Sequence, residues 1–170
     1  MPSHELLPRA ALGALGGITG ASCMTVIRML AHRAGLIDKT TPQVVEEWAL
    51  HKSGVDPKGL AAHQAMEQTV HLAVGAAAGA LWGIVAGPRG GTIPAATAFG
   101  TAIWGVAFFG IVPALRLARP PWRASTTENA VNVASHAVYG AVTGLVTEEL
   151  GRQRHRRPTS NVERQRFRVG

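Results

Sequence analysis

The stretch that decides the fold is 71–87, which reads His-Leu-Ala-Val-Gly-Ala-Ala-Ala-Gly-Ala-Leu-Trp-Gly-Ile-Val-Ala-Gly. It lies in a window, 68–88, that contains no Asp, Glu, Lys or Arg, and it has glycine at every fourth position from Gly75 to Gly87. A helix of such length crosses most of the ~30 Å hydrocarbon layer of a bilayer. Because lipid provides no hydrophobic drive between helices, a column of glycines favours close packing of backbones. The stretch therefore predicts a membrane-spanning helix that packs tightly on its neighbours.

Three further windows without Asp, Glu, Lys or Arg are long enough to cross a membrane, namely 10–27, 90–115 and 129–147. Charged residues make up only 16% of the 170-residue chain, whereas about a quarter is usual in soluble domains. We therefore expect an all-α membrane protein, a four-transmembrane-helix bundle that forms one domain over 1–150. The expected spans are about 10–29, 67–87, 93–115 and 128–148.

The first connection between spans contains a helix start signal, Thr41 followed by Pro42. Apolar residues then recur at helical spacing, at Val44, Val45, Trp48 and Ala49. This pattern predicts a short amphipathic interfacial helix in the first loop, with Trp48 at the level of the lipid headgroups. A solvated loop helix is the alternative.

The last twenty residues, 151–170, carry seven of the seventeen basic residues of the chain and a single acidic one, Glu163. This composition predicts a disordered tail. Dense positive charge beside a span favours the cytoplasmic side and anionic lipid as a partner. With four spans, both termini are then expected in the cytoplasm. The net charge of +7 needs no nucleic-acid partner to explain it.

A second column of small residues follows a histidine in the last expected span. Both columns have the spacing His-x3-Gly-x3-Gly, starting at His71 and at His136, which we interpret as an internal repeat. The first span adds Gly16 and Gly20 at the same spacing of four. The predicted helix-packing residues are Gly16, Gly20, Gly75, Gly79, Gly83, Gly87, Gly140 and Gly144.

In an up-and-down bundle, the end of the first span and the starts of the second and fourth spans lie at one membrane face. The polar residues expected to cluster there are Arg28, His32, Glu67, His71, Glu128, Asn132 and His136. Ionisable groups at membrane depth are costly and indicate a functional site. Because histidine titrates close to neutral pH, the cluster is a candidate for sensing or passing protons. The alternative is that these groups only tie helices together through hydrogen bonds.

Other chemistry is scarce in the sequence. The single cysteine, Cys23, excludes a disulfide framework and a cysteine-based zinc site. The sequence contains no GxGxxG, P-loop or HExxH motif, so we expect neither an enzyme nor a cofactor. The remaining alternative is a small redox protein that holds haem b through His71 and His136, or a divalent metal through candidates His63, His71 and His136.

Single residues at the ends of the expected spans and in the loops form a recognisable order along the chain. A basic residue ends the first span, a histidine opens the second, a Pro-Pro loop precedes the fourth, and a basic tail follows. The positions are Arg28, His71, Pro120, Pro121, Glu128, Asn129 and His136. In this layout the chain resembles the YagU-like family of small bacterial inner-membrane proteins, although its first loop is shorter and its spans hold more Ala and Gly. The resemblance implies a bacterial inner-membrane location and an envelope or acid-stress role, and it supplies no substrate or catalytic residues.

These features together predict an integral inner-membrane protein, not an enzyme, whose polar cluster senses or passes protons. An accessory or assembly subunit of a larger membrane complex is the alternative, in which the glycine faces and the apolar surface bind another protein. A homo-oligomer would use the same surfaces.

Overall fold

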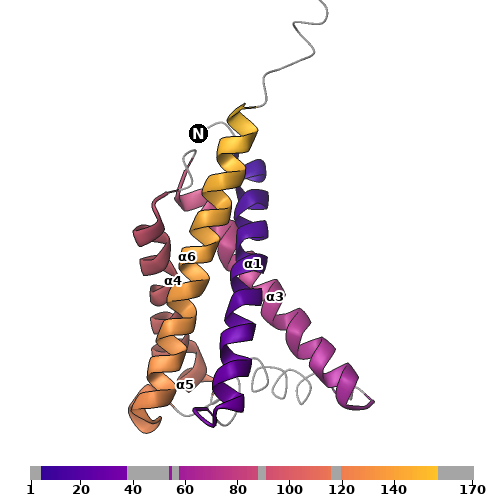
Figure 1. Ribbon diagram of the computed structural model, residues 1–170, viewed down its shortest axis with the longest axis vertical. Helices are drawn as coiled ribbons and strands as arrows, with labels where there is room; N and C mark the ends of the chain where they lie inside the picture. Colours follow the sequence, from indigo (N-terminus) through magenta and orange to yellow (C-terminus); the bar gives the residue numbers. More distant parts are fainter. Residues whose placement is uncertain (1–4, 38–53, 55–57, 88–90, 116–119, 157–170) are drawn as a thin grey trace, which may run out of the picture.

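The computed structural model describes residues 5–37, 54, 58–87, 91–115 and 120–156. Within these ranges the chain is helical and contains no strand, which confirms the all-α class. The long helices alternate in direction along the bundle (Figure 1). The elements are α1 (Leu6–Arg33), α3 (Leu60–Val85), α4 (Ile93–Val106), η2 (Ala107–Ile111), α5 (Val112–Ala114), η3 (Pro121–Arg123) and α6 (Thr126–Arg156). The interfacial helix predicted over 41–49 lies outside the described residues.

Of the helices that the structure describes, three are long and apolar enough to cross a membrane, namely α1, α3 and the continuous segment Ile93–Ala114. The protein is therefore a helical membrane protein. The fourth expected span falls on α6, which is less apolar than the other three. Four polar residues within this expected span are hidden from the surroundings, because Asn132, Ser135, Thr143 and Thr147 are all buried.

The centre of the bundle is formed by α1 and α6. Helix α1 packs against both α3 and α6, and α4 packs against the other side of α6. Helices α3 and α4 meet near their connection, where the rings of Trp82 and Phe99 lie 5.2 Å apart. From there α3 diverges from α4 toward the opposite end of the bundle (Figure 1). We call this opposite end, where α1 ends and α3 and α6 begin, the polar end.

Glycines line both faces of α1. Toward α6, a Cβ on Gly20 would lie 2.7 Å from Thr143 Oγ1, and a Cβ on Gly16 would lie 2.7 Å from Thr147 Oγ1. A second pair, Gly13 and Gly17, faces α3. This pair was not among the predicted packing residues, because Gly16 and Gly17 are adjacent in the sequence but point about 100° apart on the helix. The signal was present, since Gly13 and Gly17 are also four residues apart.

Helix α3 presents its own glycines to α1. A Cβ on Gly79 would lie 2.6 Å from Gly17 Cα, and a Cβ on Gly75 would lie 2.6 Å from Ala21 Cβ. A Cβ on Gly83 would meet the backbone of Arg9. Backbones in contact leave no room for side chains, so these glycines set the distance between the helices.

Gly87 does not belong to this column, contrary to the prediction from spacing. Helix α3 ends at Val85, Gly87 has a φ of +74°, and a Cβ there would meet nothing within 4 Å. Glycine adopts this left-handed conformation readily, so Gly87 is a turn residue that follows the helix.

The glycines of α6 pack against α4. A Cβ on Gly144 would lie 2.5 Å from Ala96 Cβ, and a Cβ on Gly100 would lie 2.8 Å from Gly140 Cα. Every main helix contact in the described bundle therefore contains glycine. This pattern is expected where packing in lipid depends on close van der Waals contact.

Helix α6 also extends further than predicted. It continues to Arg156, so the first six residues of the expected disordered tail, 151–156, are helical. Ion pairs across one turn support this extension, because Arg152 lies 3.4 Å from Glu148 and 3.0 Å from Glu149. The rest of the predicted tail, 157–170, lies outside the described residues.

Candidate functional site: a buried polar cluster

Arg28 is the centre of the candidate site. It lies on α1 near the polar end and is only 3% exposed. Its guanidinium interacts electrostatically with the carboxylates of Glu67 on α3 and Glu128 on α6. The last part of α1 therefore places a charged group between two helices that each contribute an acidic residue.

Both histidines of the expected cluster lie close to this guanidinium. His71 on α3 interacts electrostatically with Arg28, and His136 on α6 interacts with both Arg28 and His71. The residues lie far apart in the sequence and on three different helices. The folded bundle thus brings two titratable rings and a permanent charge to one depth.

Backbone carbonyls fix the orientation of both rings. His71 Nε2 lies 3.2 Å from the carbonyl oxygen of Ala21 on α1, and His136 Nδ1 lies 2.8 Å from the carbonyl oxygen of Asn132. A carbonyl can only accept, so each of these ring nitrogens is the donor. In the neutral rings, the other nitrogen of each histidine then carries no proton and can accept a hydrogen bond.

Asn132 lies one turn before His136 on α6 and is 3% exposed. Its side-chain oxygen is buried and has no hydrogen-bond partner in the described part of the chain. Buried polar groups almost always have a protein or water partner. The site therefore contains an amide oxygen as a hydrogen-bond acceptor, in addition to the unprotonated ring nitrogens of the histidines.

An irregular stretch of the third span forms the aromatic wall of the site. The Val112 N–H donates to the carbonyl of Ala107, five residues back, and Pro113 next to it has no N–H to donate. Such a local π-helix widens the turn. It places the buried Phe108 ring edge-on to His136, with ring centroids 6.1 Å apart.

Two further polar contacts hold the polar end together. Thr25 Oγ1 on α1 and the Gln68 side-chain amide on α3 lie 3.4 Å apart. Asn129 Nδ2 donates to the carbonyl of Pro121 at 2.8 Å, which attaches the Pro-Pro segment to the start of α6. Thr25 and Gln68 were not among the predicted site residues, although the pair lies at the depth of the cluster.

One residue predicted for the cluster lies apart from this group. His32 was expected in the cluster, but its side chain is exposed in the last turn of α1. The side chain of His32 points about 40° away from that of Arg28, because four residues are slightly more than one helical turn. At this level α3 has already diverged from the rest of the bundle. His63 lies in the first turn of α3, one turn before Glu67. Among the described residues no group of three or more His, Cys, Asp or Glu side chains could hold a metal.

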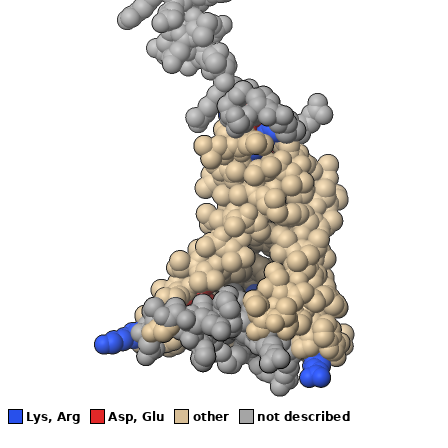
Figure 2. All heavy atoms as spheres, turned by 180° about the vertical axis from the view of Figure 1, so that it is seen from behind, with Lys and Arg blue, Asp and Glu red and all other residues tan. Residues whose placement is uncertain are grey.

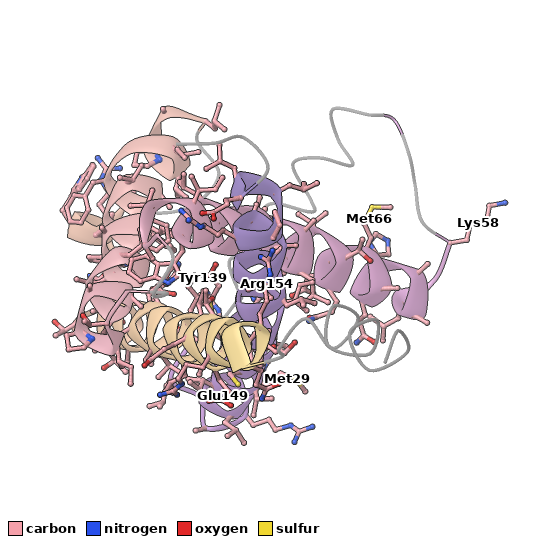
Figure 3. All side chains as sticks on the ribbon, turned by 90° about the horizontal axis from the view of Figure 1, so that it is seen from above. Met29, Lys58, Met66, Tyr139, Glu149 and Arg154 are labelled. Atoms are coloured by element: carbon pink, nitrogen blue, oxygen red, sulfur yellow. The ribbon has the colours of Figure 1, made fainter. Side chains whose placement is uncertain are left out.

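The centre of the bundle is closed above the cluster by a small apolar core. Ala21, Met24 and Tyr139 are buried there, and Leu72 and Ile103 pack against them. Figure 3 shows Tyr139 in the space enclosed by the four long helices. Its hydroxyl donates to the carbonyl of Gly75 at 2.7 Å, which links α6 to α3 across the bundle.

Comparisons with protein-family models, with curated proteins and with solved structures return no match. The fold and the site therefore define the class by themselves. This is a helical membrane protein in which glycine contacts hold a charged, histidine-containing cluster inside one end of the bundle.

Proposed function

We propose that this protein takes up protons at the polar cluster and so senses or passes them across part of the membrane. The observation that supports this function is the burial of Arg28, 3% exposed, beside two histidines and two carboxylates. A charged residue in a spanning helix is costly and usually serves a substrate or proton. Glycine contacts at every main helix interface already provide close packing, which leaves the cluster available for such a role.

We propose further that α6 is a fourth span and that the protein lies in the bacterial inner membrane with both termini in the cytoplasm. The resemblance to the YagU-like family and its acid-stress role support this placement. The basic tail would then bind anionic lipid, and the first loop would form the interfacial helix. In this orientation the polar end faces away from the cytoplasm.

Proton uptake would act through charge. A proton on His71 or His136 adds a second positive charge beside Arg28, where the surroundings are poorly screened. The neighbouring charges are Arg28 from α1, Glu67 from α3 and Glu128 from α6, while the segment Ile93–Ala114 contributes no ionisable side chain. Repulsion is expected to loosen the polar end, where α3 already diverges.

The test is the thermal stability of the detergent-solubilised protein at about pH 7.5 and about pH 5.5. We expect the wild type to melt earlier in acid, because Arg28 and burial oppose a proton on either histidine in the folded bundle, whereas the unfolded chain binds it readily. The double variant His71→Gln, His136→Gln keeps polar side chains but cannot take a proton. It is expected to melt at the same temperature at both pH values.

His32→Gln is the matched control, because this histidine is exposed outside the cluster and its loss should leave the acid response unchanged. A double variant that melts much earlier than the wild type at both pH values would mean that the histidines are structural ties. An acid response that persists in the double variant would likewise count against the proposal.

A further inference from the structure

A tryptophan and an arginine follow one another on the surface of the polar end. They are Trp122, which is 64% exposed, and Arg123, which is also exposed, and they end the short helix η3. Figure 2 shows basic side chains that project from both sides of the lower edge of the molecule, which is the polar end. We infer that Trp122 and Arg123 bind the headgroup of an anionic phospholipid, which holds the polar end at the surface of its leaflet.

The apolar surface of the third span ends beside these two residues. Phe109 and Ile111 are exposed and contact lipid there, and the centroid of the Trp122 ring lies 6.2 Å from that of Phe109. A charged residue, Arg123, follows directly. Tryptophan is typical of the level at which acyl chains meet headgroups. The indole can therefore lie against acyl chains while the guanidinium of Arg123 extends to the phosphates.

The backbone around the pair is held in place before any lipid binds. The N–H of Arg123 donates to the carbonyl of Pro120 at 2.8 Å, which closes the short turn. Pro121 is buried, and its carbonyl accepts from Asn129 Nδ2 on α6. Because proline also fixes φ at two successive positions, little backbone freedom remains to be lost on binding. A binding site that is ordered in advance binds more tightly for the same contacts.

The charge of Arg123 is available to a partner outside the chain. Among the residues that the structure describes, Arg123 forms no ion pair. Glu67 and Glu128, which also lie at this end, interact with the buried Arg28 instead. A guanidinium matches the geometry of phosphate oxygens and can donate two N–H groups to them. Because a zwitterionic headgroup also carries a cation, an anionic headgroup is the better match.

This site is separate from the lipid contact expected of the basic tail. Helix α6 starts next to η3 and has 31 residues up to Arg156, which corresponds to roughly 45 Å. A lipid bound by residues after Arg156 therefore lies in the other leaflet. The inference needs only that the protein is in a membrane, and not that the polar cluster takes up protons, so the two proposals fail independently.

The test measures which lipids surround Trp122 in a bilayer. The full chain is reconstituted in vesicles with equal amounts of phosphatidylglycerol and phosphatidylcholine, and the acyl chains of one lipid or the other carry bromine, which quenches nearby indoles. The difference between the wild type and Trp122→Phe is the signal of Trp122 alone. We expect a local preference for phosphatidylglycerol of about fivefold, the enrichment that one basic residue provides near an anionic surface.

Arg123→Gln keeps a polar side chain but no charge, and it is expected to abolish the preference. Arg123→Lys keeps the charge and should retain most of it. Arg152→Gln is the matched control and should leave the preference unchanged, because Arg152 is exposed at the opposite end and already pairs with Glu148 and Glu149. Monodispersity in detergent is the criterion that each variant folds.

Equal quenching by the two brominated lipids in the wild type would overturn the lipid site, and so would a preference that persists in Arg123→Gln. Inorganic phosphate, compared with chloride at equal ionic strength, distinguishes a lipid headgroup from a free ion. Phosphate is expected to leave the preference unchanged. A preference that phosphate abolishes and chloride does not would mean that Arg123 binds a free phosphate ion, which also contradicts the proposal.

Discussion

At the scale of single residues, the same amino acid has opposite roles at different places in this bundle. Gly79 lies in a seam where an added Cβ would fall 2.6 Å from Gly17 Cα, whereas a Cβ on Gly105 of α4 would meet nothing within 4 Å. Glycine in a helix is otherwise unfavourable by about 1 kcal/mol relative to alanine. Contact with a neighbouring backbone, rather than helix formation, therefore explains the glycine at position 79.

Gly79→Ala is accordingly expected to lower the free energy of unfolding by about 1–3 kcal/mol, because the backbones of α1 and α3 must separate. Gly105→Ala, the control in another span, is expected to be neutral or to stabilise the protein by up to about 1 kcal/mol. Unfolding in mixed detergent measures both. Equal effects of the two variants would show that the glycine seam does not determine the packing of α3 on α1.

At the scale of elements, α6 combines a low hydropathy with a central position. Its buried hydroxyls face α1 or fold back onto their own helix, where Ser135 Oγ donates to the Val131 carbonyl at 2.7 Å. Such back-bonding satisfies a hydroxyl without a partner on another helix. The small side chains of α6 allow α1 to approach closely, while their polarity contributes little.

The triple variant Ser135→Ala, Thr143→Val, Thr147→Val removes these hydroxyls and nearly preserves their size. We expect its free energy of unfolding to stay within about 1–2 kcal/mol of the wild type, since hydrogen bonds of this kind average about 0.6 kcal/mol in membrane proteins. Thr143→Leu adds volume against Gly16 and Gly20, and is expected to cost about 1–3 kcal/mol. A triple variant that fails to fold would mean that the hydroxyls themselves hold α6 in place.

At the scale of the whole molecule, the described surface is strongly apolar. Large side chains such as Val85, Val106 and Leu81 are 66%, 66% and 52% exposed. In water such a surface would favour association, whereas in a bilayer it contacts acyl chains. In the interior, an apolar core lies next to buried charge at Arg28.

The protein is therefore expected to remain in the membrane fraction after alkaline carbonate washing, which removes peripheral proteins. Three helices that can each cross the hydrocarbon layer make release unfavourable. A peripheral membrane protein from the same preparation, released by the wash, is the control. Recovery of the chain in the soluble fraction would contradict its assignment as a membrane protein.

Much of the fold and part of the site could be predicted from the sequence. Charge-free windows indicated the helices, and spacing by four pointed to Gly75, Gly79 and Gly83 and to His71. The spacing failed at Gly87, because the helix ends two residues earlier, and at His32, because the neighbouring helix has diverged. The spacing of residues in the sequence specifies neither where a helix ends nor in which direction the neighbouring helix runs.

The sequence by itself determined that the chain is helical and apolar enough for a membrane, because length and the absence of charge are local properties. Only the tertiary structure decided which side chains meet. It placed two glycine columns on α1, buried four polar residues of α6, and brought Arg28 into electrostatic reach of His71 and His136. These relations depend on the rotation and crossing of whole helices, which many distant contacts set together.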